Sequence, residues 1–444
     1  MNSAFNATMD SARCLALSTD ELGDLAQFAK RYQRRLNQRE RAQQEGDLRA
    51  VEHHTRGILK SFGAKVCATV CAIRLQPGQV PPTFAQIKAH ADALNPFHAV
   101  PEPVTTWLEP KTAGGYRQLV SFGWKRRALQ TMCAHILSVA YPAAPFDYSS
   151  RGRGGVNAAT KFLHKLIREG DYQYVVTVDI RDCFGSAIKK KVGELLPLPE
   201  KVVNNVLLVQ DAVTVVVKPD KGQWTGFLFP NHLPAVSAFA TDAAARRGLP
   251  QGCAASGIIM CRAVLGPLLG TLPFANRLVL IGDDLAVPVR DKLEAEAVLE
   301  TLKSLYAASP VGLLTIGRHS VSHIKGGFDF AGYRSTLKRK WIMVVDPSTK
   351  TEREMPGPEW YWHVRPTLRA YEKFEHQAAR KFHDAGGGIP GWKQVILYMK
   401  RWMASFPMWK PNYLSKQYLW LQLRAGSWRK VAATVQSIAQ KSVS

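Results

Sequence analysis

Cysteines and long apolar segments are scarce in this chain. The seven cysteines are odd in number and show no Cys-x-x-Cys spacing, which argues against a zinc site or a disulfide framework. No apolar run reaches the roughly 18 residues that a membrane span needs. The N-terminus lacks the basic segment and apolar core that are typical of a signal peptide. We therefore expect reduced cysteines, no membrane contact and a cytoplasmic location.

Acidic residues are also few relative to basic ones. The 444 residues include 59 Lys and Arg against 35 Asp and Glu, a formal net charge of +24. Half of this excess lies from Ser335 onward, in the last quarter of the chain. A charge of this size and sign predicts a polyanionic partner, with nucleic acid favoured over an acidic membrane surface.

The composition is that of a globular protein with several parts. Apolar residues make up 46% of the chain, so we expect two or three domains with substantial cores. Residues 1–95 have helical periodicity and are predicted to form an N-terminal helical extension. Residues 96–345 mix strand and helix patterns, and residues 346–444 are basic and mostly helical. The predicted fold class is therefore α+β.

The mixed region contains an ordered series of expected elements. A β-hairpin is predicted over residues 104–122, with Gly114-Gly115 at its turn. In chain order, the other expected elements are helices 125–139 and 156–168, a strand at 174–179, a strand-like run at 212–218, a helix at 291–307, short strands near 328–334 and 341–345, and helices 366–383, 392–406 and 414–424.

Three aspartates interrupt or end strongly apolar segments. Asp283 and Asp284 lie within the apolar run 278–287, which we expect to be a strand, and Asp179 ends the apolar run 174–179. An unpaired buried carboxylate costs several kcal/mol, so these side chains need a positive partner. A divalent cation is the usual one. Two apolar strands with metal-binding aspartates are what a nucleotide polymerase requires.

Five segments, in a fixed order, resemble the reverse transcriptases. The most specific is Leu249-Pro-Gln-Gly252 followed by Ser256, which matches the LPQG…S motif of that family. The others are Val-Asp-Ile-Arg-Asp-Cys-Phe at 178–184, Ile-Gly-Asp-Asp at 281–284, Gly-Phe-Asp-Phe-Ala-Gly-Tyr-Arg at 327–334, and a lysine followed by Gly-Gly-Tyr-Arg within 111–117. They resemble the first catalytic motif, the paired-aspartate turn, the primer-grip hairpin and the fingers hairpin, respectively.

The resemblance implies the architecture of a right-hand polymerase. Fingers and a ferredoxin-like palm would occupy residues 96–345, and a basic helical thumb would occupy residues 346–444. The N-terminal helical extension, residues 1–95, would be appended to this core.

The resemblance also implies a two-metal reaction. Two Mg²⁺ ions about 4 Å apart activate the primer 3′-hydroxyl and neutralise the leaving pyrophosphate in such enzymes. Asp179 and Asp283 would be the main ligands. The Ile180 carbonyl would help to bind one ion, and Asp284 would be a secondary ligand. Mn²⁺ is the alternative ion.

The same resemblance assigns residues that would bind the incoming nucleotide. Lys111 and Arg117, in the fingers hairpin, would hold its β- and γ-phosphates, since Arg suits bidentate phosphate contacts. Gln251 would lie over the nucleotide, and Gly252 would let the backbone approach it.

Aromatic residues would define the sugar and the primer end. Phe184 would lie against the sugar, where its ring collides with a 2′-hydroxyl, so dNTPs are the expected substrates. Phe330, Gly332 and Tyr333 would form the primer grip.

Two departures from the family leave other functions open. Ile281-Gly282 replaces the usual aromatic or Ala before the paired aspartates, and Gly-Asp-Asp is common in RNA-dependent RNA polymerases. Ser256-Gly257 also occurs in the matching motif of those enzymes. An RNA-dependent RNA polymerase is therefore the alternative, although such enzymes usually have an aspartate where Phe184 lies. A catalytically inactive RNA-binding scaffold is a third hypothesis, and the three intact aspartates argue against it.

The region after the primer-grip hairpin favours a stand-alone enzyme. It accommodates a helical thumb but no additional RNase H domain, and it lacks a His/Cys endonuclease pattern. The chain most resembles bacterial retron, group II intron-like and defence-associated reverse transcriptases. This implies an antiphage role, a structured non-coding RNA as template, dNTPs as substrates and DNA as product. A maturase-like or diversity-generating role is the alternative within the family. No motif indicates the mode of priming or the oligomeric state.

Overall fold

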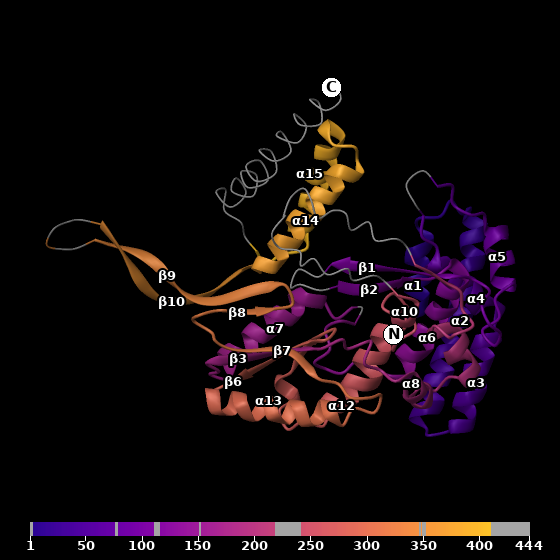
Figure 1. Cartoon of the computed structure of the whole chain (residues 1–444), viewed down its shortest axis with the longest axis horizontal. Helices are drawn as coiled ribbons and strands as arrows, with labels where there is room; N and C mark the ends of the chain where they lie inside the picture. Colours follow the sequence, from indigo (N-terminus) through magenta and orange to yellow (C-terminus); the bar gives the residue numbers. More distant parts are fainter. Residues whose placement is uncertain are drawn as a thin grey trace.

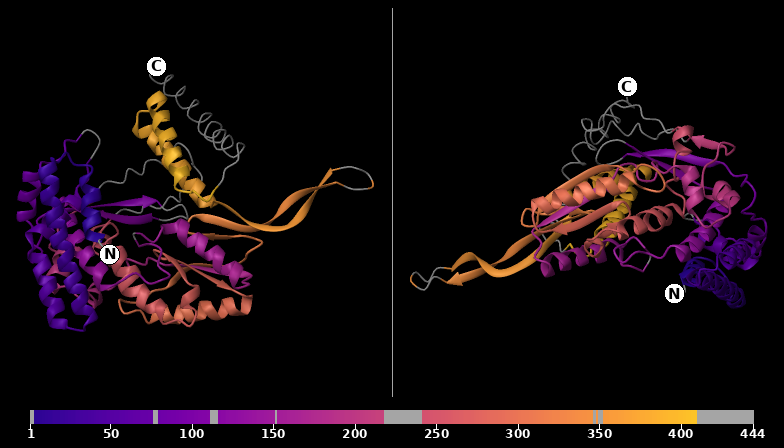
Figure 2. Two further views of the ribbon diagram at one scale, coloured as in Figure 1. Left: turned by 180° about the vertical axis from the view of Figure 1, so that it is seen from behind. Right: turned by 90° about the horizontal axis from the view of Figure 1, so that it is seen from below.

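The chain folds into a mixed structure of helices and sheets. The structure, a computed structural model, describes residues 3–75, 79–110, 116–150, 152–217, 241–345, 348 and 352–409. A layer of N-terminal helices lies at one end, and a sheet region occupies the centre (Figure 1). A helical hairpin stands above the sheets, and a long two-stranded ribbon projects from the end opposite the N-terminal helices (Figures 1 and 2).

The N-terminal layer packs on the central region through α6 (Trp124–Ala140). Its elements are α1 Ser3–Ala12, α2 Thr19–Gln44, α3 Leu48–Lys60, α4 Phe62–Ala72 and α5 Phe84–Asp92. The expected helical character of this region is confirmed. Ser18 and Glu21 form a capping box that starts α2. The Tyr32 hydroxyl of α2 lies 3.1 Å from His135 Nδ1 of α6, and both helices share one continuous apolar core with the central sheet.

The predicted hairpin at 104–122 is confirmed in its strands. β1 (Val104–Pro110) pairs antiparallel with β2 (Tyr116–Ser121), while the turn at Gly114-Gly115 lies outside the described residues. A third strand, β4 (Val215–Val217), runs parallel to β1. It is shorter than the expected run at 212–218, because residues 212–214 are not in a strand; residue 218 lies outside the described residues.

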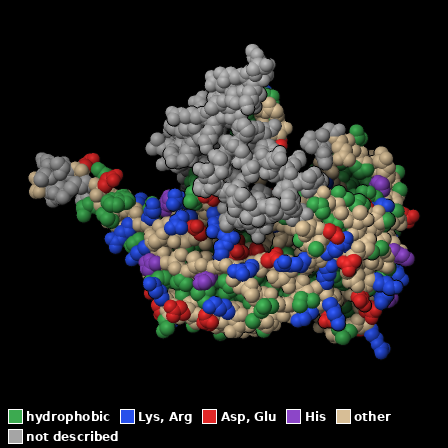
Figure 3. Space-filling model, in the orientation of Figure 1, with side chains coloured by type: hydrophobic (Ala, Val, Ile, Leu, Met, Phe, Trp, Pro, Cys, Tyr) green, Lys and Arg blue, Asp and Glu red, His purple; other side chains and the backbone are tan. Residues whose placement is uncertain are grey.

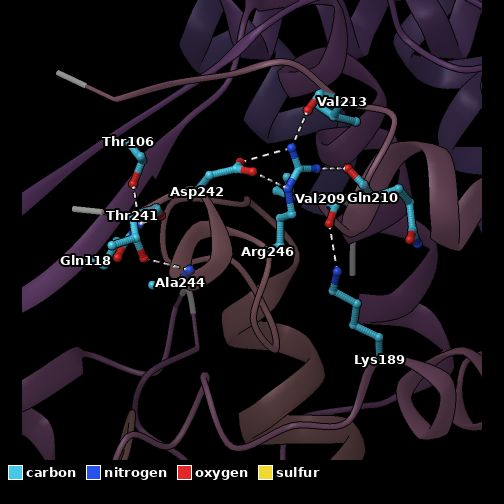
Figure 4. A network of polar contacts seen from close by, with 10 residues as sticks. All are labelled: Thr106, Gln118, Lys189, Val209, Gln210, Val213, Thr241, Asp242, Ala244 and Arg246. Carbon is cyan, nitrogen blue, oxygen red and sulfur yellow. Dashed lines mark hydrogen bonds and ion pairs between the residues drawn. The ribbon is translucent and has the colours of Figure 1, made fainter. Parts of the chain in front are cut away.

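Polar contacts attach this small sheet to α10 (Asp242–Ala245), as Figure 4 shows. Gln118 Nε2 donates to the Thr241 carbonyl at 2.8 Å. The Arg246 guanidinium donates to the Val213 carbonyl at 2.8 Å and lies 2.9 Å from a carboxylate oxygen of Asp242. The segment that leads into the Leu-Pro-Gln-Gly motif is therefore held against the β1–β2 hairpin.

The central sheet is antiparallel, with the order β5-β6-β3-β7. Its strands are β3 Tyr174–Ile180, β5 Val279–Ile281, β6 Asp284–Val289 and β7 Ile316–His323. Strand β3 agrees with its prediction, but the single strand expected over 278–287 is instead the tight hairpin β5–β6. A glycine with a left-handed backbone, Gly282 (φ 64°), makes this reversal.

Helices cover both faces of the central sheet. The side chain of Val175 packs with α7 (Gly155–Glu169) on one face, whereas Val176 and Val178 belong to the core shared with α13 (Lys292–Ala307) on the other. This follows from the two-residue alternation of a strand. The helices predicted at 125–139, 156–168 and 291–307 are all confirmed.

Short helical segments connect these larger elements. They are α8 Lys189–Leu195, α9 Glu200–Val202, η1 Val203–Leu207, α11 Ser256–Ile258, η3 Ile259–Leu265, α12 Gly266–Gly270 and η4 Ala275–Arg277.

The third sheet is longer than predicted. Strand β8 (Phe328–Phe330) pairs with β9 (Tyr333–Val345), and β9 pairs with β10 (Glu352–Pro366) to form the projecting ribbon. Only short strands near 328–334 and 341–345 were expected, and β10 was not. The register of β10 shifts between Pro356 and Trp360, so prolines and a bulge break the alternation that would have indicated a strand. The predicted boundary between residues 345 and 346 falls at the end of β9, and the three-part domain division stays a prediction.

A helical hairpin follows the ribbon. Helices α14 (Leu368–Asp384) and α15 (Gly388–Ala404) confirm the predictions at 366–383 and 392–406. They enclose a small core of their own around Phe374 and Trp402. The helix expected at 414–424 lies outside the described residues. None of the helices in the described ranges is long and apolar enough to cross a membrane.

Candidate active site

The sheet register brings the predicted aspartates together. Asp179, near the end of β3, lies directly opposite Asp284, the first residue of β6. Asp283 precedes it in the β5–β6 turn. Strand alternation places Asp179 and Asp284 on the face that α7 covers farther along the strands, and not on the face of α13. Both carboxylates thus lie at the end of this face that α7 leaves uncovered.

The β5–β6 turn is held from outside by the loop before α7. The Gly282 N–H donates to Ser149 Oγ at 2.6 Å. The loop itself is ordered by Asp147, which is fully buried and accepts from the Ser149 N–H at 2.8 Å and from Ser150 Oγ at 2.6 Å. Arg262 Nε donates to Ser150 Oγ at 3.1 Å, which ties the loop to η3. A hydrogen-bonded network anchored on the buried Asp147 therefore positions the turn that carries Asp283.

Negative charge accumulates at this end of the sheet. Burial, together with the charges of Asp283 and Asp179, raises the pKa of Asp284 to about 7. Like charges that lie directly opposite on neighbouring strands are destabilising. The Arg318 guanidinium, 3.8 Å from the Asp179 carboxylate, offsets only part of this repulsion. The arrangement favours a bound cation.

The donor set fits Mg²⁺ with ligands from a substrate. In the described ranges, no group of three or more His, Cys, Asp or Glu side chains is arranged to hold a metal ion by itself. Mg²⁺ usually binds through one or two carboxylates plus waters and substrate phosphates, and all-protein cages are unusual for it. Neighbouring aspartates at the mouth of an open cavity suit that mode of binding.

A cavity of about 860 Å³ opens beside the aspartates. The central sheet, the β8–β9 turn and the α14–α15 hairpin enclose it. The predicted site residues that line it are Asp179, Asp283, Asp284, Arg117, Phe330 and Gly332. Arg117 reaches it from β2, so residues from three separate sheets contribute to one site.

The Leu-Pro-Gln-Gly segment does not line this cavity; it connects β2 with the loop that follows β3. The Gln251 carbonyl accepts from the Val120 N–H of β2 at 2.8 Å. Gly252 has a φ of 131°, and a Cβ there would lie 1.9 Å from the Val120 carbonyl oxygen. Leu249 N–H donates to the Phe184 carbonyl at 2.9 Å. The glycine thus permits a close approach to β2, and the contacts of Gln251, Gly252 and Phe184 with a nucleotide stay predictions.

Other predicted residues are internal or outside the described part. Tyr333 is buried, donates its hydroxyl to Asn157 at 2.6 Å and packs edge-on against Phe406. It therefore anchors the β8–β9 turn to α7 and to the chain after α15. Ile180 has a buried side chain, and the structure leaves the predicted role of its carbonyl untested. Lys111 lies outside the described residues.

Several residues of the site carry no motif and were not predicted. Arg318 enters through β7, and Arg369 and Lys373 enter through α14. Asp147 and Ser149 hold the aspartate turn from another part of the chain. The spacing of Arg369 and Lys373, one helical turn apart in a basic segment, was the one available signal. The others depend on the sheet register and on long-range contacts.

Comparison with known proteins gives no family assignment. No protein-family model and no curated protein sequence matches the chain. Among solved structures, it is similar to a Sicinivirus 3Dpol RNA-dependent RNA polymerase, with 14% identity, a TM-score of 0.32, and coverage of 74% of this chain and 69% of that one.

Two telomerase structures give similar values. For telomerase from Candida albicans in complex with a fragment of telomeric RNA, the identity is 10%, the TM-score 0.33, and the coverage 76% of this chain and 60% of that one. For apo telomerase from Candida tropicalis, truncated from the C-terminal domain, the values are 12%, 0.32, 58% and 56%. TM-scores of this size carry no argument, so the interpretation of the site rests on its own residues.

Proposed function

We propose that this chain is an RNA-directed DNA polymerase. One observation carries the proposal: Asp179, Asp283 and Asp284 meet at one open cavity with the cation Arg117 and the turn at Phe330 and Gly332. Elements far apart in the sequence supply these groups. A nucleotidyl transfer site needs this combination of metal-binding carboxylates, phosphate-binding cations and a surface for the growing strand.

The residues divide the work of nucleotidyl transfer. Asp179 and Asp283 would hold the metal ions, with Asp284 as a further ligand. Bound Mg²⁺ supplies charge neutralisation at the transferred phosphoryl group and lowers the pKa of the attacking hydroxyl. Arg117 would bind the triphosphate through charge-assisted hydrogen bonds. Ser149 would keep Asp283 in position through the Gly282 N–H.

The substrates and the biological role follow from the sequence resemblance. Phe184 would exclude a 2′-hydroxyl and so select dNTPs. A structured non-coding RNA would be the template, DNA the product, and antiphage defence in the bacterial cytoplasm the role. The RNA-dependent RNA polymerase alternative rests on Gly-Asp-Asp and on Ser256-Gly257. A glycine with a φ of 64° at position 282 suits a tight hairpin in either class of enzyme, so the choice of dNTPs rests on Phe184.

The test is metal-dependent synthesis by the purified chain. Labelled dNTPs or rNTPs would be incubated in parallel with Mg²⁺, a primer and an RNA template. We expect dNTP incorporation that is lost in Asp283→Asn/Asp284→Asn, whereas RNA affinity is retained.

A matched variant controls for the loss of two negative charges. Glu296→Gln/Glu300→Gln alters exposed carboxylates on α13, away from the cavity, and should leave synthesis intact. Incorporation of rNTPs alone would establish the RNA polymerase alternative. Undiminished synthesis by the aspartate variant would disprove the site assignment, and RNA binding without synthesis by the native chain would support a scaffold.

A further inference from the structure

The projecting ribbon is a second feature that the proposed site does not explain. Strands β9 and β10 pair over most of their length and leave the body of the molecule (Figures 1 and 2). An isolated two-stranded hairpin is marginally stable in water. The outer half of the ribbon exposes large side chains, for example 61% of Trp341 and 55% of Met343. An exposed arm with these features is a candidate binding element.

The root of the ribbon is firmly attached to the body. Trp362 of β10 stacks on His164 of α7, with ring centroids 4.1 Å apart and an angle of 7° between the rings. His164 Nε2 lies 2.8 Å from Ser335 Oγ of β9. The arm therefore leaves the body in a fixed direction.

The strand register gives the ribbon two different faces. Leu337 lies opposite Trp362, and both pack toward the body. The other face carries the pairs Arg334 with Arg365, Thr336 with His363, and Lys338 with Tyr361. Lys340 continues this face by the two-residue alternation. From Arg334 to Lys340 the row extends about 20 Å at the usual rise of a strand.

This face is positively charged and only partly neutralised. Arg334 pairs with Asp329 and Lys340 with Glu359. Among the described residues, Lys338 and Arg365 form no ion pair, and both are exposed. The register puts Lys338 and Arg365 on the same face as His363, and burial and the charges of these two cations lower the pKa of His363. A polyanion laid along the face would relieve this repulsion.

The row is continuous with the candidate active site. Arg334 belongs to the ribbon and also lines the cavity of the aspartates, together with Arg369 and Lys373 of α14. Figure 3 shows Lys and Arg side chains gathered where the ribbon leaves the body, with hydrophobic side chains farther out. Regularly spaced cations with an exposed tyrosine are typical of surfaces that follow a nucleic-acid strand.

We propose that the face of the ribbon with Arg334, Lys338, Lys340 and Arg365 binds the phosphate backbone of an RNA strand that extends outward from the cavity. The identification of the ligand as RNA rests on the proposed function, whereas the requirement for a polyanion rests on the charges of this face.

The experiment compares the two faces of the ribbon by RNA binding. Fluorescence anisotropy would measure the affinity of the full chain for labelled single-stranded RNAs, over a series of salt concentrations and without nucleotides. The RNAs would be about 8 and about 30 nucleotides long, since one single-strand binding module covers about 4–16 nucleotides. The test variant is Lys338→Gln/Arg365→Gln. The matched control is Lys325→Gln/Arg339→Gln, which removes two exposed cations that lie over the Trp360 ring, on the other side of the ribbon from Lys338.

The test variant should lose about tenfold in affinity for the long RNA at low salt. The slope of log affinity against log salt should become less steep by about 1.4, because each single-strand phosphate contact contributes about 0.7. The short RNA, which the cavity alone can hold, should lose less. The control variant should bind both RNAs as the native chain does.

Equal losses in both variants would show a general effect of charge and would overturn the proposal. The proposal would also be overturned if the test variant kept the native affinity and salt dependence. That result would point to a protein as the ligand of the ribbon. Circular dichroism confirms that the variants are folded. Because binding is measured without synthesis, failure of the polymerase proposal in the incorporation assay and failure of this inference are separate outcomes.

Discussion

At the scale of single residues, the aspartate cluster is held in place by groups that carry no motif. Asp283 occupies a turn whose Gly282 N–H is bound by Ser149, and Ser149 is ordered by the buried Asp147. A metal site depends as much on such supporting contacts as on its ligands. The loop before α7 is therefore part of the site, although it lies far from Asp283 in the sequence.

The first prediction concerns this supporting contact. Ser149→Ala removes the acceptor of the Gly282 N–H, and a lost hydrogen bond of about 1.4 kcal/mol corresponds to about a tenfold fall in kcat. Single-turnover incorporation would measure it, with RNA affinity as the reference that should not change. Ser149→Thr restores the hydroxyl and should restore the rate. A normal rate in Ser149→Ala would remove the residue from the site.

The second prediction concerns the choice of sugar. If Phe184 lies against the sugar, Phe184→Val opens space for a 2′-hydroxyl and should raise rNTP incorporation relative to dNTP at least tenfold, because steric exclusion costs more than about 1.4 kcal/mol. The ratio of kcat/KM for matched dNTP and rNTP pairs would measure it. Cys183→Val, a buried neighbour, is the control and should keep the native ratio. An unchanged ratio in Phe184→Val would mean that Phe184 does not select the sugar.

At the scale of elements, the root of the ribbon depends on one neutral histidine. Only 5% of His164 is exposed. Burial, assisted by the charge of Arg168, lowers the pKa of His164 from 6.5 to about 3. The folded chain keeps this imidazole neutral at a pH where the unfolded chain protonates it. Its contribution to stability is therefore complete above pH 6.5 and decreases as the pH falls from 6.5 toward 3.

The third prediction follows from this sign. Between pH 7 and pH 5 the native chain should lose about 2 kcal/mol of unfolding free energy through His164, since each pH unit below 6.5 costs about 1.4 kcal/mol. The His164→Gln variant lacks this imidazole, so its unfolding free energy should fall by about 2 kcal/mol less than that of the native chain between pH 7 and pH 5. Urea unfolding at both pH values would measure the difference. Parallel pH dependence in the two proteins would show that His164 is not protonated on unfolding.

At the scale of the whole molecule, the apolar core is divided unevenly. One core continues from the N-terminal helices through α6 into the central sheet and α13. The α14–α15 hairpin has a small core of its own around Phe374. The N-terminal layer is therefore a structural part of the sheet region, whereas the helical hairpin is the more separable unit.

The fourth prediction uses this difference. Deletion of residues 1–92 should expose the α6 side of the core and prevent folding, because several large buried side chains lose their contacts. Deletion of residues 367–444 should leave a folded protein whose Tm is within a few degrees of the native value. Thermal unfolding followed by circular dichroism would compare them. A folded protein without residues 1–92 would show that the N-terminal layer is independent.

The long regular elements could be predicted because local pattern decides them. The helices at 125–139, 156–168 and 291–307 and the strand at 174–179 follow directly from periodicity and flanking turns. Strand β10 could not be predicted, because prolines and a register shift interrupt its alternation. The sequence predicts one strand where the β5–β6 hairpin lies, because a two-residue reversal within an apolar run leaves little local signal.

The sequence by itself determined the chemistry available to this protein: its positive charge, its three aspartates in apolar strands and the Leu-Pro-Gln-Gly segment. These depend on residue type and local order alone. The tertiary structure decided which of these groups meet. Sheet register placed Asp179 opposite Asp284, long-range hydrogen bonds fixed Gly282 through Ser149, and strand pairing made one face of the ribbon basic. Such contacts join distant parts of the chain, and local sequence cannot specify them.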